Sequence, residues 1–113
     1  SAYLAAVRGQ DFDRLLTLLH PDVLLRADAL VGRTARPVHV RGATAVATRA
    51  MAAVARAVVA APALVNGTVG LVATSRGQLA IALVMTYDHA TITRIDVVAE
   101  PQHLAALDVG VLA

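Results

Sequence analysis

The sequence predicts one α+β domain over residues 1–113, in which a helical hairpin and a long helix pack on a curved antiparallel sheet. A chain of 113 residues is long enough for one hydrophobic core, and 58% apolar against 16% charged residues excludes a disordered chain. Helical spacing of apolar residues dominates the first half. After Pro62 the apolar residues instead form short runs separated by turn residues, which is typical of strands.

The first half predicts three helices and two strands. Gly9 ends the first helix and Asp11 is placed to cap the second, which the pair His20-Pro21 ends because a residue before proline disfavours helical angles. The segment from Asp28 to Gly42 is the least regular. The predicted elements are helices at Ser1–Arg8, Phe12–Leu19 and Ala43–Ala61, a strand at Val23–Arg26 and an edge strand at Pro37–Val40.

The second half predicts an antiparallel meander followed by a final helical turn. Its separators, Asn66-Gly67, Ser75-Arg76-Gly77 and Asp88-His89-Ala90, favour hairpin turns. The predicted strands are Ala63–Val65, Val69–Thr74, Leu79–Tyr87 and Thr91–Ala99, and Pro101 begins a helical turn that runs to Leu107.

Neither face of the strand Leu79–Tyr87 suits water, since Leu, Ile and Met alternate with Ala and Val. We expect the helices to cover one face. For the other face we expect a homodimer through the sheet, with an interior pocket as the alternative.

Composition excludes several classes of function. No cysteine is present, so disulfides and sulfur-ligated zinc are excluded and a cytoplasmic location is expected. The longest apolar runs, such as Leu79–Met85, are too short to cross a bilayer, and no membrane partner is expected. A net charge of +2 and the lack of tryptophan argue against direct binding of nucleic acid.

The polar residues do not form a motif for metal or cofactor binding. The four histidines, at positions 20, 39, 89 and 103, have no spacing typical of metal ligands, so neither a metal site nor a cofactor is expected. Arg94 and Asp96 point to the same face of one strand. They form either a polar pair inside the domain or an exposed ion pair, of which the exposed pair is the more common.

The order of elements resembles the SnoaL-like cone fold, a cystatin-like roll shared by ketosteroid isomerases, polyketide cyclases and nuclear-transport-factor-2-like domains. Within that group, several short sequence segments resemble the C-terminal accessory domain of extracytoplasmic-function sigma factors. These segments are Gly9–Asp13, His20–Asp28, Val40–Ala43, Ala63–Gly67 and Ile92–Val98.

This resemblance implies a regulatory domain that modulates transcription initiation through contacts with the sigma core domains or RNA polymerase. Two stretches take the places of sigma-class signature motifs, Asp28–Val31 for an Asp-led glycine-rich loop and Glu100–Leu104 for an Asn-Pro-Asp-Lys-Leu motif. Asp28, Pro101 and Leu104 match them, which implies interaction roles; roles in capping and turns are the alternative. The chain is then expected to be a fragment of a longer sigma factor or a free-standing relative, and an apolar ligand in the cone is compatible with either.

The alternative function is a small-molecule enzyme of the isomerase or cyclase kind. Isomerases of this fold need a carboxylate base, a tyrosine and a second acid. Tyr3 resembles the isomerase tyrosine, but Ala27 falls at the position of the base, with Asp28 one residue late and facing the other way. The second acid falls within Leu83–Met85, which has no ionisable group. Two of the three parts are missing, so a non-catalytic domain is the favoured interpretation.

Overall fold

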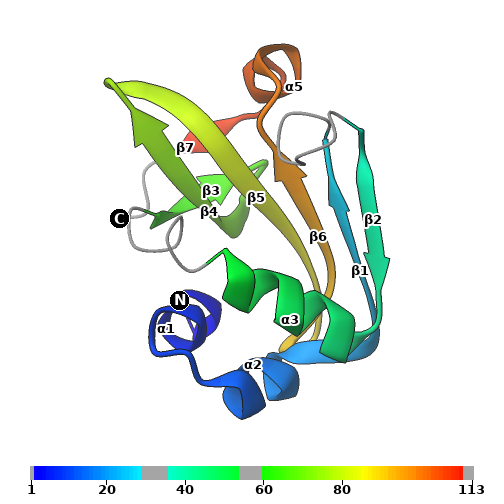
Figure 1. Cartoon of the computed structure of the whole chain (residues 1–113). Helices are drawn as coiled ribbons and strands as arrows, with labels where there is room; N and C mark the ends of the chain where they lie inside the picture. Colours follow the sequence, from blue (N-terminus) through cyan, green and yellow to red (C-terminus); the bar gives the residue numbers. More distant parts are fainter. Residues whose placement is uncertain (1, 29–35, 54–59, 111–113) are drawn as a thin grey trace.

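The computed structural model describes residues 2–28, 36–53 and 60–110, and the helices of the first half lie on one side of a curved, open sheet (Figure 1). The helices are α1 (Ala2–Arg8), α2 (Phe12–Leu18), α3 (Ala43–Ala52) and α5 (Pro101–Ala105). The strands are β1 (Leu19–Ala27), β2 (Val38–Arg41), β3 (Ala61–Val65), β4 (Thr68–Ser75), β5 (Gln78–Asp88), β6 (Thr91–Val98) and β7 (Val109–Gly110).

The described strands form one seven-stranded sheet in the order β2-β1-β6-β5-β4-β3-β7. All neighbouring pairs are antiparallel except β1 and β6, which run parallel. The predicted α+β class and the antiparallel meander from β3 to β6 are confirmed, and the parallel pairing of β1 with β6 is a feature that the sequence did not predict. A long connection allows β1 to pair in parallel with β6, because almost the whole chain between them is available to form the crossover.

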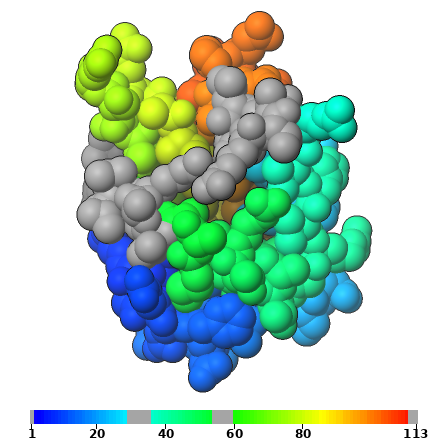
Figure 2. Space-filling model, viewed as in Figure 1, coloured from blue at the N-terminus to red at the C-terminus, as the bar shows by residue number. Residues whose placement is uncertain are grey.

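The core lies between the sheet and helices α1, α2 and α3. Leu25 is opposite Ile95, and Ile95 is opposite Met85, so these three side chains share the face that the helices cover. Leu15 of α2 and Val46 of α3 are fully buried against that face. In the space-filling view, α3 lies between the N-terminal helices and β2 (Figure 2).

The second helix ends one residue earlier than predicted, and the strand after it is longer. Leu19 already lies in β1, where it pairs with Ile92, and the strand runs through His20 and Pro21. The predicted cap at Asp11 is confirmed, since its side chain accepts a hydrogen bond from the Arg14 N–H at 3.1 Å. Pro21 disfavours helical angles at His20, as predicted. The residues around Pro21 are extended, however, so no turn separates the helix from the strand.

The long helix predicted at Ala43–Ala61 was wrong at its C-terminal end. Helix α3 ends at Ala52, residues 54–59 of the prediction lie outside the described residues, and Ala61 belongs to β3, opposite Val72. A run of alanine and valine contains no residue that stops a helix, so helix propensity could not locate the C-terminal end of α3. The conformation of Ala61 is decided by its pairing within the sheet.

The turns of the meander are confirmed, with one short strand added. Asn66 and Gly67 both have positive φ, as do Arg76 and Gly77, which matches the tight hairpins expected at these separators. Strand β7 was not predicted; two residues are too few to produce a detectable pattern. In the described part of the chain, no helix has the length and apolarity needed to cross a membrane.

The face of the sheet opposite the large helices carries its own small apolar cluster. Ala63, Val65 and Ala82 are buried there by the alternation of the strands, and α5, with its buried Leu104, contacts β5. The second apolar face predicted for β5 is therefore partly covered within the chain. The homodimer through the sheet stays a prediction.

Candidate functional site

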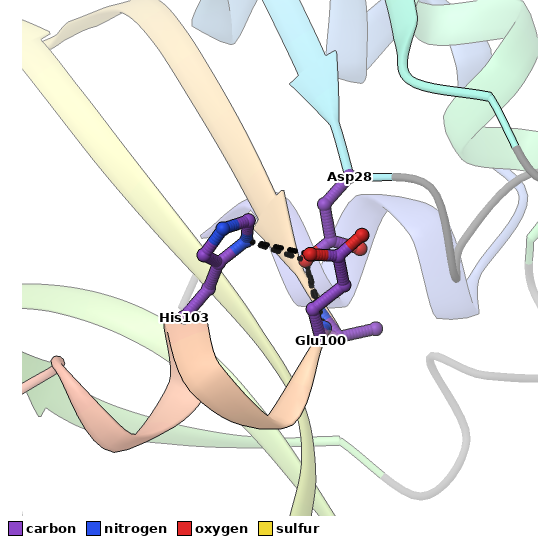
Figure 3. Close-up of polar contacts among 4 residues, drawn as sticks. Asp28, Glu100 and His103 are labelled. Atoms are coloured by element: carbon purple, nitrogen blue, oxygen red, sulfur yellow. Dashed lines mark hydrogen bonds and ion pairs between the residues drawn. The ribbon is translucent and has the colours of Figure 1, made fainter.

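Asp28 joins the end of β1 to the start of α5 (Figure 3). One carboxylate oxygen, Oδ2, accepts hydrogen bonds from the backbone N–H of Ala99 at 2.7 Å and of Glu100 at 2.8 Å. The same oxygen lies 3.4 Å from Nδ1 of His103. These contacts connect residues more than 70 positions apart in the sequence, so Asp28 fixes where the final helix leaves the sheet.

The surroundings of Asp28 favour its ionised form. Burial would raise the pKa of the carboxyl group, but the backbone N–H groups of Glu100 and Ala99 and the nearby His103 together outweigh burial and lower it. The side chain is only 10% exposed. Its second oxygen, Oδ1, is buried and has no hydrogen-bond partner among the residues that the structure describes. The site therefore holds a buried carboxylate with one satisfied and one unsatisfied oxygen.

Glu100 and His103 bring two further ligand-type groups to Asp28. Glu100 Oε2 lies 3.4 Å from His103 Nδ1, and the three residues each offer an atom within 4.8 Å of the other two. Sequence reasoning singled out Asp28 but missed its partners. The Glu-x-x-His spacing at the start of a helix was the available local signal, because residues three apart lie on one helical face.

Arg94 and Asp96 form a two-pronged ion pair on β6. Arg94 Nε lies 2.9 Å from Asp96 Oδ2, and Nη2 lies 3.2 Å from Oδ1. This hydrogen-bonded pairing raises the pKa of Arg94. The side chains are 39% and 31% exposed. Their predicted shared face is confirmed, and it is the face opposite the large helices, because their neighbour Ile95 points into the core.

A cavity of about 460 Å³ lies beside these groups. Its volume falls in the range of small-molecule sites. Arg26, Arg94 and Asp96 contribute from β1 and β6, and Val84 contributes from β5. By the register of the strands, these four share the face opposite the core. The cavity is also lined by Ala27, Asp28, Pro37, His39, Asn66, Val97, Val98, His103 and Leu107.

The residues considered for isomerase chemistry are not brought together. Tyr3 is 7% exposed within the core cluster, where burial raises its pKa to about 12, and it does not line the cavity. Ala27 is buried in the same core cluster, whereas Asp28 belongs to the contacts with α5. No carboxylate among the described residues meets Tyr3.

The two matches in the final helix have different surroundings. Pro101 is exposed and occupies the first turn of α5, as predicted. Leu104 is 8% exposed, so its main contribution is to hold α5 on the sheet.

Comparison with solved structures confirms the fold. The chain is similar to the extracytoplasmic function sigma factor SigJ of Mycobacterium tuberculosis, with a TM-score of 0.68 and 24% identity over 90% of this chain and 41% of that one. A candidate polyketide cyclase from Xanthomonas campestris pv. campestris matches with a TM-score of 0.53 and 19% identity, over 93% of this chain and 90% of that one. A protein with a cystatin-like fold from Methylobium petroleophilum matches with a TM-score of 0.56 and 15% identity, over 96% and 80%.

These likenesses show the predicted SnoaL-like, cystatin-like cone fold. The chain spans less than half of the length of SigJ. No protein-family model and no curated protein sequence matches the chain.

Proposed function

We propose that this chain is a regulatory accessory domain of an extracytoplasmic-function sigma factor, which modulates transcription initiation by contacting the sigma core domains or RNA polymerase. The observation that carries the proposal is the likeness to SigJ, which covers 90% of this chain at a TM-score of 0.68. The short sequence segments that resemble the sigma-factor accessory domain support the proposal independently. They include Asp28, whose carboxylate accepts a hydrogen bond from the backbone N–H of Glu100, and Glu100 begins the stretch that takes the place of the second signature motif.

The enzyme alternative has weaker support. The same fold occurs in a candidate polyketide cyclase, but fold alone does not determine function. An isomerase needs a base and an oxyanion-stabilising group that face the same substrate. In this chain Ala27 occupies the position of the base within the core, and Asp28 is held by backbone N–H groups at the start of α5.

We propose that the exposed side of α5 and the neighbouring ion pair of Arg94 and Asp96 contribute to the contact with the sigma core. Pro101, Gln102 and His103 are exposed on α5. The short helix is held from beneath by Leu104 and by Asp28, so these exposed side chains are presented on a fixed support. A preorganised surface loses less entropy on binding than a flexible one.

The test begins with the reading frame that encodes this chain. We expect it, or an adjacent gene, to encode promoter-binding sigma domains. Transcription in vitro with that sigma factor, with and without the present domain, should then show a change in initiation. The 113-residue chain should also bind the isolated sigma core in biolayer interferometry.

A matched pair of variants tests the surface. Gln102→Arg on α5 should weaken binding to the sigma core at least about tenfold, because it places a charge in the contact. Gln78→Arg, at the exposed start of β5, should leave binding unchanged. Lack of any sigma-type gene, or equal effects of the two variants, would count against the proposal. Turnover of a steroid enone that Tyr3→Phe abolishes would favour the enzyme instead.

A further inference from the structure

The hydrogen bonds among the described residues leave one buried oxygen of Asp28 without a partner. Buried polar atoms in folded proteins nearly always have a partner, because an unsatisfied carboxylate oxygen loses its hydration without compensation. Asp28 Oδ1 lacks a hydrogen-bond partner in the described ranges. Water does not replace that partner easily, because the side chain is only 10% exposed. The other oxygen is fully occupied by two backbone N–H groups.

The groups around this carboxylate share one chemical property. Glu100 brings a second carboxylate and His103 an imidazole, and one atom of each of the three residues lies within 4.8 Å of the others (Figure 3). Two carboxylates this close repel each other, and a cation between them removes that repulsion. Among the described residues, His103, which is 56% exposed, is the basic side chain that lies within ion-pair distance of both carboxylates.

We propose that Asp28, Glu100 and His103 form a binding site for a divalent transition-metal cation, with Zn²⁺ as the simplest member of the class. Carboxylate oxygens and a neutral imidazole nitrogen are donors that Zn²⁺ accepts, and cysteine is not required. Asp28 would use Oδ1, while the bonds from Ala99 and Glu100 to Oδ2 hold the carboxylate in place. Hydrogen bonds of this kind orient the ligands of known metal sites.

Three protein ligands leave coordination positions open. Asp28 and His103 also line the cavity of about 460 Å³, so the open positions would be accessible to water or a small anionic ligand from that side. This inference does not depend on the proposed role in transcription. A metal at this place would add a second link between the end of β1 and the start of α5, which the Asp28 carboxylate already connects.

The 113-residue chain is first treated with a chelator, which is then removed. The chain is then titrated with ZnCl₂, and binding is measured by isothermal titration calorimetry. We expect one ion per chain and a rise in melting temperature that a chelator reverses. Co²⁺ as a second probe should give visible absorption bands of a metal bound to nitrogen and oxygen ligands.

The variants separate this site from weak binding to surface histidines. His103→Ala and Glu100→Gln should each weaken Zn²⁺ binding at least about tenfold, and both side chains are exposed enough that folding should survive. His89→Ala is the matched control, because His89 lies 2.8 Å from the Asp88 carboxylate on an exposed turn outside the site.

Two results would overturn the proposal. One is no saturable binding by the wild-type chain. The other is an equal loss of affinity in His89→Ala and His103→Ala, which would indicate adventitious surface binding. Circular dichroism of each variant establishes that a loss of affinity is not a loss of fold.

Discussion

Tyr3 makes the stability of this chain sensitive to alkaline pH in a way that can be isolated. The phenol is buried in the core, and burial raises its pKa to about 12, against an ordinary value near 10. The folded chain therefore holds a proton that the unfolded chain releases. The stabilising contribution is complete below pH 10 and is lost as the pH rises from about 10 to about 12.

The size of this effect follows from the pKa difference. At pH 11 an unfolded tyrosine is largely ionised while Tyr3 in the fold is largely protonated. The free energy of unfolding should then be lower by about 1.4 kcal/mol than at pH 9. Few other groups interfere, since all ten basic side chains are arginine and the chain has no cysteine. Tyr87, which is 40% exposed, also has a raised pKa because of partial burial, so it needs its own control.

The assay combines urea unfolding at pH 9 and pH 11 with the ultraviolet absorbance of phenolate. With two tyrosines and no tryptophan, each phenol can be assigned by comparing Tyr3→Phe with Tyr87→Phe. Tyr3→Phe should remove the later titration and most of the loss of stability at pH 11. The reasoning is refuted if Tyr3 in the folded chain titrates near pH 10, or if Tyr3→Phe loses as much stability as the wild type.

Three further changes test the packing of the site. Asp28→Ala leaves two backbone N–H groups at the start of α5 without their acceptor and should cost about 2–3 kcal/mol in urea unfolding with chelator present; a loss below about 0.5 kcal/mol would contradict the assigned role. Gly70→Ala should lower the free energy of unfolding by about 1–3 kcal/mol, because the added Cβ would overlap the carbonyl oxygen of Leu83. An unchanged melting temperature would show that β4 and β5 can move apart at this point. Arg94→Ala should change stability by no more than about 1 kcal/mol, since the pair with Asp96 is about one third exposed; a larger loss in thermal unfolding would mean that the pair is more than a surface contact.

The parts of the fold that were predictable from sequence are those with strong local signals. The hairpins follow from Asn66, Gly67 and Gly77, which tolerate positive φ. The runs of strand-forming residues between the turn residues place β5 and β6 within one residue of their observed ends. The cap at Asp11 is equally local. Each of these features depends on residues a few positions apart.

The features that sequence reasoning missed depend on distant partners. The end of α3 at Ala52 has no local marker, and the parallel pairing of β1 with β6 requires knowledge of where the chain returns. The same limit applies to the site. Asp28 could be singled out from sequence, but its contacts with Glu100 and His103 join residues separated by more than 70 positions.

The register of β1 decides which face of the sheet each residue at the end of this strand meets. Ala27 points to the face that α1, α2 and α3 cover, and Tyr3 is buried in the same core cluster. Asp28 is the next residue, so it leaves that face and is taken up by the N–H groups at the start of α5. A shift of one residue in a strand reverses the direction of the side chain. The acid that could have served as a base thereby becomes the residue that fixes the final helix, which is the surface we propose for contact with a protein partner.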